Sequence, residues 1–277
     1  MELRQLDHND IPSLMRLNDA LNWTFTQADF ETVFAGGLMF GYMSDEAIVA
    51  SAAAFPIGES GASVGAVMVA PDFRRRGLGS ALMRQLHDHP SLSTVQFRLV
   101  STDEGLPLYE ALGYRTVTRL NKMARRMPWP RETGKTAVRD VRPEDLAEVV
   151  SLDAEAVGGA RADLIAARLK QAYSAKVLVS ERGQVSGLAI GAEQRGQLLC
   201  GPVVAKRAVD AVALLHALSH QYQGQIRVDI ADENAPLLEL LRQEGFQRET
   251  HPPVMVRGRE TPLWGARFNA PMAQMFG

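Results

Sequence analysis

The strongest chemical signal in the sequence is a turn that combines arginine with glycine. In chain order its residues are Arg74, Arg75, Arg76, Gly77, Leu78, Gly79 and Ser80. An apolar run, Val64–Val69, precedes the turn, and Leu82, Met83 and Leu86 after it fit one helix face. A helix that begins near Gly77 would direct its unpaired N–H groups and the positive end of its dipole into the turn. Because glycine has no Cβ, an anion can approach the main chain, and the guanidinium groups would add charge-assisted hydrogen bonds. The turn is therefore predicted to bind a phosphate group.

Two common nucleotide-phosphate motifs are missing from the sequence. It has no G-x-x-x-x-G-K-[ST] and no G-x-G-x-x-G after a first strand, which argues against a nucleoside triphosphate. The pattern present is R-x-x-G-x-G, Arg74 to Gly79, after an apolar strand that ends near Pro71. It resembles the signature of the GNAT superfamily, the GCN5-related N-acetyltransferases, and this resemblance implies that the turn binds the pyrophosphate of acetyl-CoA. The alternative is an amphipathic helix with a solvated basic first turn, where positive charge opposes the helix dipole.

A second marker follows at Leu106–Tyr114, a short helix with a glycine after it. With Pro107, Tyr109, Gly113 and Tyr114 it resembles the GNAT pattern P-x-Y-x-x-x-G-[FY]. The resemblance implies that Tyr109 is the general acid, because a phenol of pKa about 10 can hydrogen-bond or protonate a CoA thiolate whose thiol has a pKa near 8.5. A helix tyrosine that only packs on the sheet is the alternative.

The resemblance also implies how the other site residues act. In GNAT proteins two central strands separate, and the pantetheine arm of CoA lies along one of them. That strand corresponds to Val67, Met68 and Val69, and the other to Gln96–Thr102. A main-chain N–H near Met68 would polarise the thioester carbonyl and hold the oxyanion. Transfer to the amine is expected to be direct, without an acyl-enzyme.

The acceptor side of the site is less defined by the sequence. Trp23 lies in the loop between the first two predicted helices, where GNAT acceptors enter, and is expected either to line that pocket or to pack in the core. The general base stays open between a water chain and several polar residues in turns. These are Asp45, Glu46, Thr102, Asp103 and Glu104.

The elements that would position these residues follow a GNAT order. We expect a strand at Met1–Leu6, a helix capped by Asp10, and a second helix opened by a capping box of Thr26 and Asp29. A hairpin of residues 38–43 and 47–55, a turn at 58–61, the central strand, the helix after Gly77 and a strand at 94–100 come next. The fold class is therefore α/β (α+β), with a mixed, mostly antiparallel sheet flanked by helices.

The start of the chain recurs after an irregular segment. Eight positions beginning at Arg4 match eight beginning at Arg139 at a constant shift of 135 residues, which indicates duplication. We expect a catalytic domain at 1–125, a linker at 126–137 and a degenerate copy at 138–277. The second copy has no glycine in Lys206–Leu215 and has Leu241 where the first has Tyr109. The whole chain resembles bacterial tandem-GNAT proteins with one complete and one degenerate domain.

Composition restricts the remaining function classes. The 277 residues carry a formal charge of −2, which argues against a nucleic-acid binder. The single cysteine, Cys200, forms no internal disulfide, and no apolar stretch resembles a signal peptide or a membrane span, so a cytoplasmic protein is expected. The scattered histidines predict no metal site.

These observations predict an acetyl-CoA-dependent N-acetyltransferase that acts on the primary amine of a small molecule or peptide, as a monomer or homodimer. The alternatives are transfer of a longer acyl group, a non-catalytic acetyl-CoA sensor, and nucleic-acid binding through Arg74–Arg76.

Overall fold

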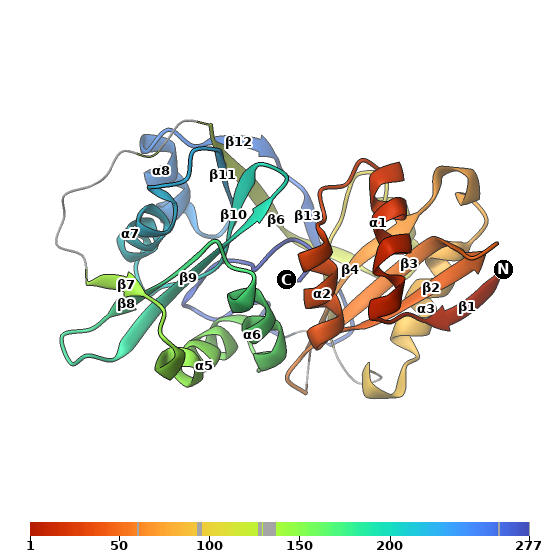
Figure 1. Ribbon diagram of the computed structural model, residues 1–277, viewed down its shortest axis with the longest axis horizontal. Helices are drawn as coiled ribbons and strands as arrows, with labels where there is room; N and C mark the ends of the chain where they lie inside the picture. The colour runs from red at the N-terminus through yellow and green to blue at the C-terminus, as the bar shows by residue number, and fades with distance from the viewer. Residues whose placement is uncertain (60, 93–95, 127–128, 130–136, 260, 277) are drawn as a thin grey trace.

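A computed structural model describes residues 1–59, 61–92, 96–126, 129, 137–259 and 261–276, and shows two similar halves side by side (Figure 1). The first half consists of β1 (Glu2–Gln5), α1 (Ile11–Ala20), α2 (Gln27–Gly36), β2 (Leu38–Ser44), β3 (Ala47–Ile57), β4 (Gly61–Val69), α3 (Leu78–His87), β5 (Gln96–Val100), α4 (Leu106–Ala111) and β6 (Arg115–Arg125). The second half consists of β7 (Val138–Asp140), α5 (Leu146–Val157), α6 (Ala162–Lys170), β8 (Ser174–Val179), β9 (Val185–Gln194), β10 (Gln197–Val204), α7 (Ala208–Ser219), β11 (Gln225–Ala231), α8 (Ala235–Gln243), β12 (Gln247–Thr250), β13 (Pro253–Arg257) and β14 (Phe268–Ala270).

The duplication is visible in matching ion pairs. Arg4 forms two hydrogen bonds with the carboxylate of Asp10 (2.6 and 2.9 Å), and Arg139 forms the same pair with Asp145 (2.6 and 2.8 Å). Each carboxylate also accepts a main-chain N–H three residues before it. The sequence predicted that the side chain of Asp10 caps α1. In the structure this side chain instead closes the 3-10 turn that precedes α1. The predicted cap of α2 is present.

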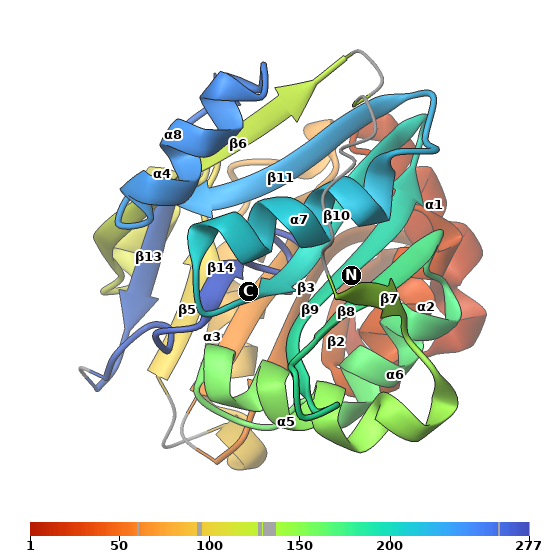
Figure 2. The same cartoon turned by 90° about the vertical axis from the view of Figure 1, so that its left-hand side faces the viewer.

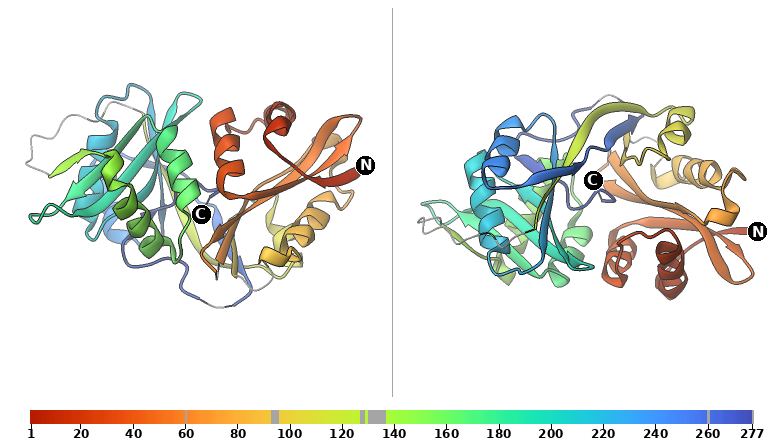
Figure 3. Two further views of the ribbon diagram at one scale, coloured as in Figure 1. Left: turned by 60° about the horizontal axis from the view of Figure 1, so that its bottom comes forward. Right: turned by 90° about the horizontal axis from the view of Figure 1, so that it is seen from above.

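Helices cover both faces of the first-half sheet. Figure 3 shows α1 and α2 on one face and α3 on the other. β3 accordingly has buried residues on both of its faces: Ala52 and Ala54 pack in the cluster of α3, and Ala53 and Phe55 pack in the cluster of α1 and α2. In the second half, α7 and α8 lie across the outer face of the sheet (Figure 2).

Strands of the two halves pair with each other where the halves meet. The strand order is β1-β2-β3-β4-β5-β13-β6-β11-β10-β9-β8-β7, so β13 of the second half lies between β5 and β6 of the first. β6 pairs with β13 through its first residues and with β11 through Leu120–Arg125. Main-chain hydrogen bonds thus join the halves into one continuous sheet. The sequence predicted domains at 1–125 and 138–277 but did not predict this pairing.

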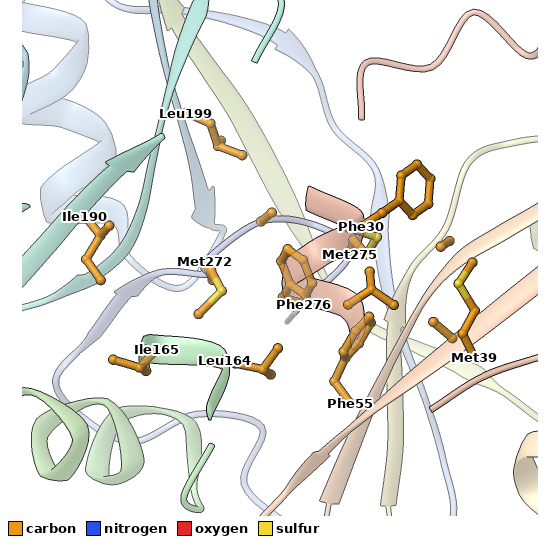
Figure 4. Packing of buried hydrophobic residues seen from close by; sticks show 14 of the residues in the cluster. Phe30, Met39, Phe55, Leu164, Ile165, Ile190, Leu199, Met272, Met275 and Phe276 are labelled. Atoms are coloured by element: carbon orange, nitrogen blue, oxygen red, sulfur yellow. The ribbon is translucent and has the colours of Figure 1, made fainter. Parts of the chain in front are cut away.

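The C-terminal segment, residues 265–276, runs between the halves. Figure 4 shows Met272, Met275 and Phe276 packed among residues of both halves, including Phe55 and Leu164. A Cβ on Gly65 of β4 would lie 2.5 Å from the carbonyl oxygen of Met275, so the segment approaches the first-half sheet at van der Waals distance. The main core is therefore shared by the two halves.

Parts of three predicted features lie outside the described residues. They are residues 127–128 and 130–136 of the linker, Ser60 of the turn before β4, and residues 94–95 at the expected start of β5. Trp129, within the predicted linker, is buried in the second-half core, and its indole N–H donates to Glu244 (2.9 Å).

Candidate active site

The predicted phosphate-binding turn leads into α3, with Gly77 as the residue before the helix. Gly77 has a φ of +79°, and nothing lies within 4 Å of the position that its Cβ would take. The residue is exposed, and no side chain caps the helix. The first N–H groups of α3 can therefore donate hydrogen bonds to an anion, because the glycine before the helix leaves room for the anion to approach.

The three arginines of the turn have different surroundings. The guanidinium of Arg74 lies 3.6 Å from the carboxylate of Glu104, in the loop after β5. Arg76 donates to the carbonyl oxygen of Asp72 (2.8 Å). Arg75 has a φ of +61°, which strains a residue with a side chain, and no ion-pair partner for it is found within the described part of the chain. Arg75 is therefore the arginine of the turn that is most available to a bound anion.

Gly79 has another role than the sequence suggested. It is buried, and its Cβ would lie 3.3 Å from Leu108 of α4 and 3.8 Å from Val69 of β4. The absence of a Cβ at Gly79 thus permits close packing of α3 against α4 and β4, whereas at Gly77 it leaves open space for a ligand. Leu78 is buried in the same cluster and Ser80 is half-buried.

The two central strands separate next to this turn. β4 and β5 are parallel and pair only from Gly61 to Val64 and from Gln96 to Leu99. The rest of β4, Gly65–Val69, continues without β5 beside it. This part of β4 presents a free edge that leads directly to the turn before α3, and a linear ligand can pair with such an edge.

A β-bulge in β4 decides which N–H groups face the free edge. The register against β3 shifts in the middle of β4, and beyond the shift the N–H of Ala70 donates to the carbonyl oxygen of Val49 in β3 (2.8 Å). N–H groups alternate between the two edges of a strand. Met68 therefore turns its N–H toward β3, whereas Val67 and Val69 turn theirs to the free edge. The oxyanion-binding N–H, which the sequence placed near Met68, is therefore narrowed to its neighbours Val67 and Val69 as candidates.

Tyr109 lies on α4, beside the start of α3. Its side chain is 7% exposed and packs on Gly105, whose Cβ would lie 2.9 Å from the tyrosine ring. Burial raises the pKa of Tyr109 above its ordinary value, so the phenol is protonated at neutral pH. The packing of Leu108 on Gly79 fixes α4 against the turn that precedes the helix. The structure thus brings Tyr109 and the predicted phosphate turn to the same end of β4.

Behind Tyr109 lies a polar pair that the sequence did not indicate. The ring of Tyr114 lies 5.8 Å from that of Tyr109, and its hydroxyl is 2.9 Å from Nε2 of His87. Burial, with a contribution from Arg257, lowers the pKa of His87 to about 4, so the ring is neutral at pH 7. His87 lies on α3, Tyr114 follows α4, and Arg257 lies on β13 of the second half. Because these segments are far apart in the sequence, no local motif predicted that His87 would contact Tyr114.

Trp23 lies in the loop between α1 and α2, as expected. It is half-buried, its ring makes an edge contact with Phe25 (5.4 Å), and it packs on the core that both halves share. These contacts support the interpretation that Trp23 packs in the core.

The acidic residues weighed as general bases lie in exposed turns. Asp45 and Glu46 form the β2–β3 turn, and Asp103 and Glu104 follow β5. Glu104 pairs with Arg74. Thr102 accepts the N–H of Gly105 and so shapes the loop before α4. All four carboxylates are exposed to solvent.

The corresponding gap in the second half is filled by the chain itself. β10 and β11 pair only over Gln197–Leu199 and Gln225–Arg227 before they separate. β14 then pairs with the freed edge of β10, Val203 opposite Ala270 and Val204 opposite Phe268. The edge that is free in β4 is therefore occupied in β10. Leu241, the counterpart of Tyr109, is buried and cannot donate a proton.

The structure also bears on metal-binding groups, membrane-spanning helices and an exposed thiol. No group of three or more His, Cys, Asp or Glu that could hold a metal is found within the described ranges. In the same part of the chain, no helix is long and apolar enough to cross a bilayer. Cys200 is buried, and burial raises the pKa of its thiol to about 12.

Comparisons with known proteins match both halves. The family described as acetyltransferase (GNAT) domain matches residues 35–116, and a second family with the same description matches residues 149–267. The uncharacterized N-acetyltransferase YitH of Bacillus subtilis (strain 168) is 25% identical over all of this chain and 98% of its own length.

Solved structures share the fold. A proposed acetyltransferase from Pyrococcus horikoshii superposes with a TM-score of 0.82 at 21% identity, over 100% of this chain and 95% of that one. A tandem GNAT protein from the clavulanic acid biosynthesis pathway gives 0.66 at 17% identity, over 94% and 100%.

Proposed function

The chain belongs to the GNAT acetyltransferase family and is an acyltransferase with two GNAT domains in tandem, and on this premise we propose that its first half transfers acetyl from acetyl-CoA to a primary amine. The acceptor is the amine of a small molecule or peptide. Residues 1–125 supply the reacting groups, and residues 138–277 form the degenerate partner that supports them.

The observation that carries this proposal is the contrast between the two gaps in the sheet. In the first half, the free edge of β4 leads to an open, left-handed Gly77 and to Tyr109. In the second half, β14 occupies the matching edge, and Lys206, Arg207 and Ala208 replace the glycine turn. The strand edge with which a pantetheine arm would pair is therefore free in the first half and occupied in the second.

The residues around the first gap have distinct roles in the proposed reaction. The diphosphate binds the N–H groups at the start of α3, assisted by the guanidinium of Arg75. The pantetheine arm pairs with the free edge of β4. The N–H groups of Val67 and Val69 face the thioester, and one of them holds the carbonyl oxygen as negative charge develops there.

Tyr109 acts on the leaving group. The neutral amine attacks the thioester carbon, a C–N bond forms, and the C–S bond breaks to release CoA as a thiolate. The attacking nitrogen loses one proton to water, and after the proton transfer to sulfur water returns a proton to the Tyr109 phenolate. Tyr109 donates a hydrogen bond and then its proton to that sulfur. Its raised pKa keeps the proton available at neutral pH but makes the phenol a weaker acid, so the hydrogen bond precedes the full transfer.

Release of free thiol from acetyl-CoA with a panel of amines tests the proposal. Tyr109→Phe should lower kcat about 100-fold, with the Kd for CoA unchanged, because the lost hydroxyl acts only after binding. Tyr173→Phe, at an exposed tyrosine of the second half, is the matched control and should keep full turnover.

The same assay separates the alternatives. Tight CoA binding without thiol release for any amine, together with an inconsequential Tyr109→Phe, would support an acetyl-CoA sensor and contradict catalysis. Faster turnover with longer acyl-CoA donors would replace acetyl transfer by transfer of a longer chain. Affinity for DNA that falls steeply with salt and that CoA does not compete away would support nucleic-acid binding.

A further inference from the structure

A second cavity lies in the degenerate half, and the proposed acetyl transfer makes no use of it. It encloses about 530 Å³ and opens between the starts of α7 and α8. This volume is within the usual range for small-molecule sites. It lies at the carboxyl ends of the parallel strands β10 and β11, which is where ligands collect in such sheets.

The cavity does not suit coenzyme A. β14 already pairs with the edge of β10 that a pantetheine arm would need. Asn269 of β14 also donates to the carbonyl oxygen of Ala205 (2.9 Å) and accepts a hydrogen bond from Asn234 (2.9 Å), so the strand is fixed at both ends of the gap. The occupant must therefore be a smaller molecule that fits beside β14.

One wall of the cavity is flat and apolar. The rings of Trp264 and Phe268 stack with an angle of 4° between their planes and a centroid distance of 4.3 Å, and both line the cavity. Val117 and Leu263 add aliphatic surface. A wall of this kind favours a planar ring in the ligand.

Two opposite charges line the same cavity. Lys206, just before α7, is exposed, and no ion pair of its ammonium is found in the described part of the chain. The N-termini of α7 and α8 add positive potential on this side. Glu233, before α8, supplies a carboxylate that accepts a hydrogen bond from the Thr118 hydroxyl (2.8 Å) and keeps a second oxygen for a cation.

The indole N–H of Trp264 lies at the same wall. It is buried, and it has no hydrogen-bond partner among the residues that the structure describes. Behind the cavity, Arg98 of β5 donates to the carbonyl oxygen of the lining residue Leu263 (2.5 Å), and within the described ranges its buried Nε and Nη2 have no partner. Arg227, its counterpart on β11, binds the carboxylate of Asp229 through those same two atoms.

We propose that this cavity binds an aromatic amino acid. The ring lies against Trp264 and Phe268, the carboxylate faces Lys206 and the start of α7, and the ammonium faces Glu233. Binding of this ligand is independent of acetyl transfer, because none of these residues takes part in the proposed reaction.

Calorimetry on the full chain with four probes tests each contact. L-Phenylalanine should bind. 3-Phenylpropionate lacks the amine, phenethylamine lacks the carboxylate, and L-leucine lacks the ring, so each should bind at least about tenfold more weakly. Lys206→Met should weaken phenylalanine and phenylpropionate but not phenethylamine. Glu233→Gln should weaken phenylalanine and phenethylamine but not phenylpropionate.

Matched variants complete the test. Ala266→Trp, at an exposed position on the rim, should fill the cavity and abolish binding of all probes, whereas Lys170→Met and Glu239→Gln, on exposed surfaces of α6 and α8, should leave binding unchanged. The proposal is overturned if phenylalanine gives no heat at millimolar concentration, if binding survives Ala266→Trp, or if the two charge variants affect all probes alike.

Discussion

Replacement of Gly77 by alanine should separate coenzyme A binding from folding. Gly77 has a φ of +79°, and its Cβ would meet no atom within 4 Å, so the substitution creates backbone strain without a steric clash. A left-handed L-residue costs about 1–2 kcal/mol. For a chain of this size each kcal/mol lowers Tm by about 2–4 °C. The fold should therefore survive with a small loss of stability.

Binding of coenzyme A should fall much further. A methyl group at Gly77 enters the open space in which the proposed diphosphate meets the N–H groups at the start of α3. Loss of one hydrogen bond to a charged group is worth about 1.5–3 kcal/mol, which corresponds to roughly 10- to 100-fold in Kd. Calorimetry with CoA measures this change directly.

Gly183 provides the matched control. It has a φ of +78° in the turn between β8 and β9, and again nothing lies within 4 Å of its Cβ position. Gly183→Ala should lower Tm as much as Gly77→Ala but leave the Kd for CoA unchanged. Equal Kd values for the two variants would refute the assignment of the phosphate site.

Two further predictions concern the support of the site. Burial lowers the pKa of His87 to about 4 in the folded chain, so the stability that depends on its neutral form is complete above pH 6.5 and is lost as the pH falls toward 4, on the order of 2–3 kcal/mol. His87→Gln should flatten the denaturation midpoint against pH in this window, and a slope equal to that of wild type would contradict the shift. Gly65→Ala should lower the free energy of unfolding by about 1–3 kcal/mol, because its Cβ would collide with Met275 at 2.5 Å. Gly61→Ala, on the same strand with its nearest atom at 3.6 Å, should be close to neutral, and equal denaturant midpoints for the two would disprove close packing of the C-terminal segment on β4.

Local sequence patterns were sufficient for the elements and for the duplication. The spacing of Thr26 and Asp29 predicted the cap of α2, and Gly77 marked the start of α3. The repeat at a shift of 135 residues aligned Arg4 with Arg139, and the structure gives both arginines the same kind of ion pair. These features depend on residues close together in the chain, so side-chain type and spacing specify them.

The roles of individual site residues depend on the register of the strands, which the sequence did not predict. The bulge in β4 directs the N–H groups of Val67 and Val69, on either side of Met68, to the free edge, and a Cβ at Gly79 would meet Leu108 of α4. His87 meets Tyr114 across 27 residues of chain. Such contacts depend on distances between distant segments, which no local pattern records.

The sequence by itself determined the two repeated units and the glycine turn before α3, because each is specified by side chains close together in the chain. Only the tertiary structure decided that β6 and β13 join the halves and that β14 fills the second gap. The physical reason is that strands pair through main-chain N–H and C=O groups, which every residue except proline carries, so the side chains of a strand do not reveal which distant edge it will occupy.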